Sequence, residues 1–138
     1  MNTYTFDEIQ IGHKESFSVT ITEAERDKFR DITGDINPLH NDEEYAKSLG
    51  HDKCVVFGML SASYLSTLAG VYLPGKNSLI QKIEVNFRKP VYIGDTLTIS
   101  GEVTEKSETF KFIEIKVEIK NQDGVKVVKG KMEIAVAE

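Results

Sequence analysis

Residues 56–72 have the sequence VFGMLSASYLSTLAGVY and contain no charged side chain. Apolar and small residues would cover every side of a helix with this sequence, which is the composition of a helix enclosed on most sides. We therefore predict a buried central helix at 56–72, with the rest of the fold built around it.

After this segment, and after Pro74 and Gly75, the sequence changes to a period of two, which indicates β-strands. A turn is predicted at Gly94 and Asp95, and a hairpin loop at 121–124, NQDG. Near Phe110 the alternation loses phase, which is typical of a β-bulge. The predicted strands carry these alternating apolar residues: Ile83, Val85 and Phe87; Leu97 and Ile99; Ile113, Ile115, Val117 and Ile119; Met132, Ile134 and Val136.

Before the central helix, residues 22–33 predict a short amphipathic helix that ends near Gly34. Thr22 followed by Glu25 three residues later is a capping-box pattern. The residues expected on one helical stripe are Ala24, Phe29 and Ile32.

A second short helix is expected at 42–49, with Asn41 or Asp42 as its cap and Gly50 at its end. A further strand is predicted near 15–21. Together these elements predict a single α+β domain over residues 1–138, in which a curled antiparallel sheet is wrapped around the central helix. A chain of this length buries about two-thirds of its unfolded surface, so no disulfide is required.

Composition limits the classes of partner. The net charge of −5 argues against a nucleic-acid surface, and no apolar run approaches the roughly 20 residues that cross a bilayer. We expect a small-molecule partner. The single cysteine, Cys54, cannot form an intramolecular disulfide and no secretory leader is recognised, so a cytoplasmic location is predicted. His13 and His51 have no companions at metal-ligand spacing, so no metal is expected.

Residues 31–42, DITGDINPLHND, link the two short predicted helices and place Asp35 and His40 on either side of Asn37 and Pro38. Pro38 disfavours a helical conformation at Asn37, so the segment is expected to turn. A turn of this length can bring Asp35 and His40 side by side around one water molecule. The alternative is that Asp35 and Asn37 only form a turn and that His40 is a surface residue.

Three segments together resemble the MaoC-like hydratase/dehydratase family, which includes the (R)-specific enoyl-CoA hydratases. They are FRDITGDINPLHNDEEYAKSLG (29–50), VVFGMLSASYLSTLAGVYLPG (55–75) and NFRKPVYIGDTLTISGEV (86–103). The D-x-N-P-x-H motif followed by G-M-L is the most specific part. The resemblance covers about residues 5–105 and implies the hotdog fold, usually as a homodimer whose sheets join.

The resemblance also implies roles for residues of this chain. Asp35 and His40 would activate the water that adds to an enoyl thioester, and the backbone N–H of Gly58 would bind the thioester oxygen. Asn37 would orient the pair or bind substrate, with turn formation as the alternative. Ser63 and Ser66 on the central helix would contact substrate, with small-residue packing as the alternative. One departure from the family pattern is Phe57, where His or Pro is frequent.

These roles predict hydration of enoyl thioesters of coenzyme A or acyl carrier protein, or the reverse dehydration. No cofactor is expected beyond the coenzyme A of the substrate itself. The phosphates of coenzyme A could meet Lys76, Arg88 and Lys89, or these side chains could simply be solvated. Two other functions fit the same fold: an acyl-CoA thioesterase, and a non-catalytic domain that binds acyl thioesters.

Overall fold

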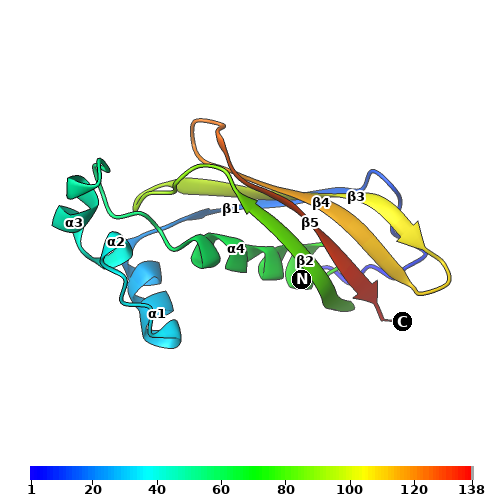
Figure 1. Cartoon of the computed structure of the whole chain (residues 1–138). Helices are drawn as coiled ribbons and strands as arrows, with labels where there is room; N and C mark the ends of the chain where they lie inside the picture. The colour runs from blue at the N-terminus through cyan, green and yellow to red at the C-terminus, as the bar shows by residue number, and fades with distance from the viewer. Residues whose placement is uncertain (138) are drawn as a thin grey trace.

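The computed structural model describes residues 1–137, which form one five-stranded antiparallel sheet in the order β1-β3-β4-β5-β2, with helices to one side (Figure 1). The five predicted strands and the layout of a curled sheet with a helix against it are confirmed. The elements are β1 (Lys14–Thr20), α1 (Glu23–Thr33), α2 (Pro38–Asn41), α3 (Glu43–Ser48), α4 (Gly58–Thr67), a π-helix (Leu68–Tyr72), β2 (Ser78–Phe87), β3 (Thr96–Ser107), β4 (Phe112–Lys120) and β5 (Lys126–Val136).

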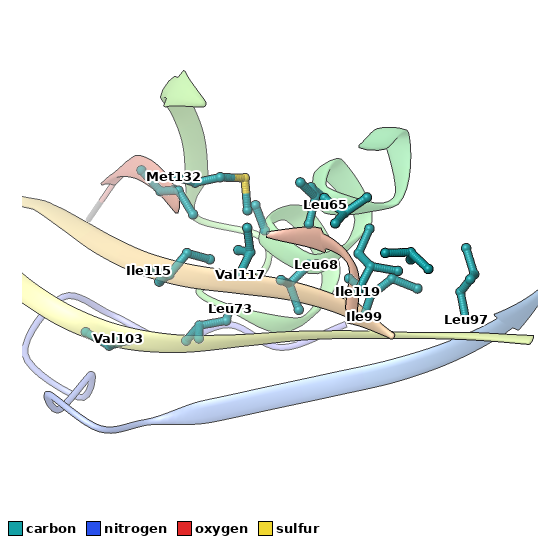
Figure 2. Packing of buried hydrophobic residues seen from close by; sticks show 14 of the residues in the cluster. Leu65, Leu68, Leu73, Leu97, Ile99, Val103, Ile115, Val117, Ile119 and Met132 are labelled. Atoms are coloured by element: carbon teal, nitrogen blue, oxygen red, sulfur yellow. The ribbon is translucent and has the colours of Figure 1, made fainter. Parts of the chain in front are cut away.

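The core lies between the sheet and the central helix. Leu65 of α4 and Leu68 of the π-helix lie among apolar side chains of the inner sheet face, such as Ile119, in Figure 2. The apolar residues of β3 and β4 that alternate in the sequence are fully buried here, while their charged neighbours face outward. Burial of this apolar surface is the main force that holds α4 against the sheet.

The central helix is buried on one side only. Its α-helical part ends at Thr67 and continues as the π-helix to Tyr72. Met59 is 66% exposed, and Ser63 and Ser66 are exposed as well. The prediction of a helix enclosed on most sides is therefore wrong for the single chain, because α1 to α3 gather near the start of α4 and leave its outer side uncovered (Figure 1).

Helix α1 has the predicted capping box and end. The N–H of Ala24 donates to Thr22 Oγ1 at 3.3 Å, and the N–H of Thr22 donates to the Glu25 carboxylate at 2.8 Å. The hydrogen bond from Thr22 holds the pKa of Glu25 below its ordinary value. Gly34 ends the helix at φ 72°, a left-handed conformation that glycine adopts without strain.

The predicted apolar stripe of α1 is only partly correct. Phe29 packs against the core, but Ile32 is 83% exposed and no residue of α1 is fully buried. The helix contacts the core through a narrow strip, because it lies beside the start of α4 and not under the sheet (Figure 1).

The 34–42 segment is more helical than predicted. Instead of a plain turn, Asn37 caps a four-residue helix, α2, that begins at Pro38. Proline is well tolerated at a first helical position, because the N–H that it lacks has no partner there. The next helix, α3, begins at its cap Asp42 as expected.

Of the two predictions made for the chain on either side of β4, one is confirmed and one is wrong. The hairpin at 121–124 is confirmed, with Gly124 at φ 74°. The bulge predicted near Phe110 is wrong: residues 108–111 form the turn between β3 and β4, and Phe110 lies exposed in it. Register shifts occur instead at three other places in the sheet.

Strand β2 forms one edge of the sheet, where Ile83 and Phe87 are 47% and 53% exposed. The strand itself is confirmed, but its apolar side chains lie at the open side of the molecule. Within residues 1–137, no helix is both long and apolar enough to span a bilayer.

Candidate active site

A cavity of about 960 Å³ lies between the short helices, the start of α4 and strand β2. Four residues singled out in the sequence line it together, namely Asp35, His40, Gly58 and Ser63. The rest of its wall is largely apolar: Phe29, Thr33, Phe57, Met59, Ala62, Ile83, Val85 and Phe87. A few polar groups in an apolar cavity are typical of a small-molecule site.

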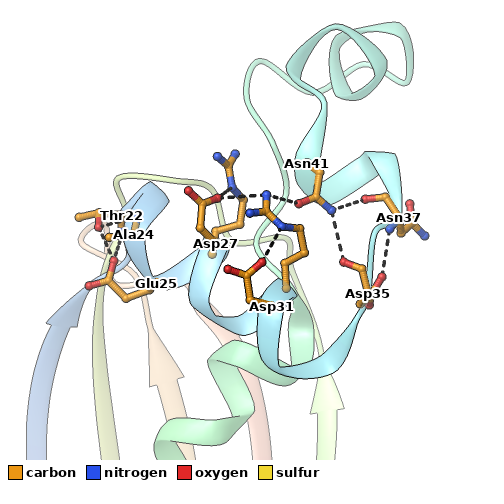
Figure 3. Close-up of polar contacts among 10 residues, drawn as sticks. Thr22, Ala24, Glu25, Asp27, Asp31, Asp35, Asn37 and Asn41 are labelled. Carbon is orange, nitrogen blue, oxygen red and sulfur yellow. Dashed lines mark hydrogen bonds and ion pairs between the residues drawn. The ribbon is translucent and has the colours of Figure 1, made fainter.

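Asp35 is held by the residues on either side of it. Its N–H donates to Thr33 Oγ1 at 3.2 Å, and its Oδ1 accepts the N–H of Asn37 at 3.1 Å. Asn41 Nδ2 donates to the carbonyl oxygens of Asp35 and Asn37, at 3.4 and 2.9 Å (Figure 3). These bonds occupy one carboxylate oxygen and leave Oδ2 with no partner among the described residues.

His40 lies at the end of α2, half-buried, with its Nδ1 2.7 Å from the carbonyl oxygen of Val55. A carbonyl oxygen only accepts hydrogen bonds, so Nδ1 carries the proton. In the neutral ring Nε2 is then the unprotonated nitrogen and can accept a proton. The ring packs against Phe57, with centroids 4.4 Å apart, so the residue that departs from the family pattern forms an apolar support under the imidazole.

Gly58 is the first residue of α4, and its setting favours close approach of a ligand. Within the described chain, α4 is the one α-helix whose N-cap residue makes no side-chain hydrogen bond; Thr22, Asn37 and Asp42 cap the other three. The first N–H groups of α4 therefore stay available as donors. A Cβ at Gly58 would lie 3.0 Å from the Phe87 ring, so any side chain here would have to push that ring aside.

The remaining candidates from the sequence, Asn37, Ser63 and Ser66, lie in different settings. Asn37 Oδ1 accepts the N–H of Leu39 at 3.0 Å, which is the bond of a helix cap, and Asn37 is not part of the cavity wall. Ser63 lines the cavity, and its hydroxyl donates to the Leu60 carbonyl at 2.6 Å. Ser66 is exposed one turn further along α4 and does not line the cavity.

A second cavity, of about 290 Å³, was missed in the sequence. It shares His40, Gly58 and Phe87 with the first, and it is also lined by Ser61. Helical spacing is the signal that could have found Ser61, because it lies one turn after Gly58. Among residues 1–137, no three His, Cys, Asp or Glu side chains gather as a metal site would require.

Comparison with known proteins places this chain in a family. The family model described as "MaoC like domain" matches residues 7–125. An (R)-specific enoyl-CoA hydratase of Aeromonas caviae is 34% identical over 88% of this chain and 91% of its own length. A 3-hydroxybutyryl-CoA dehydratase of Methylorubrum extorquens is 32% identical over 72% of this chain and 64% of its own length.

A solved structure agrees. The unliganded R-hydratase of Pseudomonas aeruginosa superposes with a TM-score of 0.92 at 30% identity, covering 97% of this chain and 86% of that one. The family match covers most of the chain. It includes all the residues that line the larger cavity, and all those that line the smaller one except Val128. The chain therefore belongs to the MaoC-like domain family and has the hotdog fold of its hydratases.

Proposed function

We propose that this protein is a hydro-lyase that adds water to trans-2-enoyl thioesters, giving (R)-3-hydroxyacyl thioesters, and catalyses the reverse dehydration. The observation that carries this proposal is the meeting of Asp35, His40 and Gly58 in one apolar cavity. The (R) configuration is taken over from the named relatives. The chemistry is acid–base chemistry, and coenzyme A enters only as part of the substrate.

In the forward reaction, a water molecule lies between Oδ2 of Asp35 and Nε2 of His40. Nε2 accepts a proton from the water as its oxygen forms a bond to C3 of the enoyl group. The π electrons of the C2–C3 bond form a C1–C2 double bond, and those of the carbonyl move to the thioester oxygen to give an enolate. When the carbonyl re-forms, C2 receives the proton that Nε2 took from the water, so that one water molecule is added in all. Each such proton transfer typically contributes about 10²–10⁴-fold to the rate.

The charge that develops on the thioester oxygen needs a fixed donor. In our proposal, the N–H of Gly58 supplies it, helped by the positive end of the α4 dipole. The missing side-chain cap of α4 supports this role. Asn37 serves as a positioning residue, because its cap bond and its N–H hold α2 and Asp35.

The apolar walls of the larger cavity suit an acyl chain. Ser63 lies along its path, while the exposed Ser66 would contact the chain only where the cavity is extended by a second subunit. The carrier in the proposal is coenzyme A or acyl carrier protein, and a reducing cytoplasm stays our prediction for the compartment.

We also propose a homodimer that forms through strand β2. This edge exposes Ile83 and Phe87, and beside it Met59 of α4 is exposed. An unpaired edge with apolar side chains tends to pair with a second strand. A partner at this edge would cover the open side of both α4 and the larger cavity.

The proposal is tested by following the absorbance of crotonyl-CoA while free thiol is assayed in the same sample. Hydration removes the conjugated absorbance and releases no thiol. Thiol release would identify a thioesterase. No change in either signal would leave only a binding domain, and both of these outcomes contradict the proposal.

A further inference from the structure

We propose that the smaller cavity receives the pantetheine arm of the thioester, with Ser61 bonding an amide of the arm and Arg88 and Lys89 meeting its phosphate end. This inference rests on the proposed function and assigns each half of the substrate to one of the two cavities. The cavities meet at Gly58, His40 and Phe87. A thioester held at Gly58 therefore borders both cavities, one for each of its two halves.

The distribution of charge indicates which cavity receives the acyl chain and which receives the pantetheine arm. The larger cavity has no lysine or arginine in its wall. The smaller one is bordered by Arg88 and Lys89, at the end of β2. Both are exposed, and neither has an ion-pair partner among residues 1–137. In both coenzyme A and a carrier protein, the pantetheine arm is attached through a phosphate group. The arm therefore fits the cavity that has the cationic border.

Ser61 supplies an independent observation. Its side chain is 1% exposed, and its Oγ is the only buried side-chain oxygen or nitrogen of the described chain without a hydrogen-bond partner. The neighbouring Ser63 instead donates to its own helix, at Leu60. A buried hydroxyl with no partner is costly, and such a group commonly has a role in binding.

The position of Ser61 fits an amide of the arm. Ser61 lies one helical turn beyond Gly58, about 4.5 Å along the axis, and lines the smaller cavity. The first amide of pantetheine lies two methylene groups beyond the sulfur of the thioester. The remaining wall is formed mainly by aliphatic side chains such as Val56, Val91 and Val128, which suit the methylene and dimethyl groups of the arm.

The first test compares three crotonyl thioesters with Ser61→Ala: crotonyl-CoA, crotonyl-pantetheine and the S-ethyl thioester, which has no amide. Loss of one neutral hydrogen bond should lower kcat/KM for the two amide-containing substrates about 3- to 10-fold. The value for the S-ethyl thioester should not change. An equal loss on all three substrates, or no loss on any, would overturn the role of Ser61.

Thermal stability gives a second readout of the same variant. Because the hydroxyl has no partner in the free protein, Ser61→Ala should melt at the same temperature as the wild type or higher. A lower melting temperature with unchanged kinetics would mean that Ser61 only binds an internal water, which contradicts the proposal. Ser16→Ala, at an exposed position on β1, is the control and should change neither readout.

The second test concerns the cationic border. The Arg88→Gln and Lys89→Gln double variant should raise KM for crotonyl-CoA several-fold at low salt, and this difference should shrink at high salt. KM for crotonyl-pantetheine, which has no phosphate, should stay at the wild-type value. The Lys14→Gln and Lys120→Gln double variant, on the outward side of β1 and β4, also removes two positive charges and is the control. Equal effects on both substrates would exclude phosphate recognition.

Binding of free coenzyme A separates this inference from the proposed function, because it requires no turnover. Calorimetry should give weaker binding to Ser61→Ala and to the Arg88/Lys89 double variant than to the wild type. If the wild type hydrates crotonyl-CoA but these variants bind coenzyme A normally, only the assignment of the smaller cavity fails. If the wild type binds coenzyme A but hydrates nothing, only the proposed function fails.

Discussion

The Nδ1 atom of His40 lies 2.7 Å from the carbonyl oxygen of Val55, a residue 15 positions later in the chain. This bond joins α2 to the segment that leads into α4, and it fixes which imidazole nitrogen is free to accept a proton. The short motif helix and the start of the central helix are thereby held together at the place where we expect water to react.

The His40 bond predicts that the stability of the segment and the catalytic base can be separated by substitution. In His40→Asn the amide nitrogen can still donate to Val55, so the melting temperature should stay near that of the wild type. Both His40→Asn and His40→Gln lack the Nε2 base and should lose about 10²–10⁴-fold in hydration rate. Steady-state rates with crotonyl-CoA, beside thermal melts, measure both effects. A folded His40→Asn protein with the wild-type rate would exclude Nε2 as the base.

Gly58→Val is predicted to block the thioester oxygen from the helix N-terminus. Loss of an oxyanion donor typically costs about 10²–10³-fold in rate. Because a Cβ here meets the Phe87 ring at 3.0 Å, the loss could also come from displaced packing. Adding Phe87→Leu makes room for the side chain and separates the two causes. If that second substitution restored the rate, Gly58 would serve packing and not catalysis.

Ile83→Lys is predicted to weaken the dimer, because it places a charge in the middle of the exposed β2 edge. Light scattering should give about twice the chain mass of 15.5 kDa for the wild type and a lower average mass for the variant. Ser16→Lys lies on β1, at the opposite edge of the sheet, and should leave the mass unchanged. A wild-type protein that is monomeric at micromolar concentration would exclude the proposed assembly.

The capping box of α1 predicts a small dependence of stability on pH. The pKa of Glu25 is lowered, chiefly by its hydrogen bond with Thr22, so its charge stabilises the folded state above the unfolded pKa. Glu25→Gln should cost about 0.5 kcal/mol at pH 7. The difference should disappear as the pH falls through the folded pKa of Glu25, which lies below the ordinary range of a glutamate. Urea titrations across this range measure it, and a difference that is constant with pH would contradict the assignment.

Much of the fold could be predicted because local patterns and tertiary packing agree. Thr22 and Glu25 predict the start of α1, and Gly34 predicts its end. The alternation of apolar and polar residues in β3 and β4 predicts which face of these strands is buried. The failures occur where no local pattern exists. Helix α2 has only four residues, too few to show a hydrophobic period. The break in alternation near Phe110 marks a turn, and the sequence alone does not distinguish such a turn from a bulge.

Part of the candidate site could be selected from the sequence for the same reason. The D-x-N-P-x-H motif and the glycine of α4 are local, so Asp35, His40 and Gly58 could be selected from the sequence. The Val55 carbonyl and the partnerless hydroxyl of Ser61 could not, because both depend on contacts that only the folded chain creates. The outer side of α4 is uncharged although it is exposed in one chain, and a partner subunit is our proposed reason.

Asp35→Asn tests the proposed water-activating pair most directly. Asparagine can still accept the N–H of Asn37 through its Oδ1, so the loop should keep its geometry and the melting temperature should stay near that of the wild type. The hydration rate with crotonyl-CoA should fall about 10²–10⁴-fold. Adding His40→Ala should lower it little further, because the two residues act on one water. An Asp35→Asn protein that keeps both the wild-type rate and the wild-type melting temperature would contradict the water-activating pair and the hydratase function that rests on it.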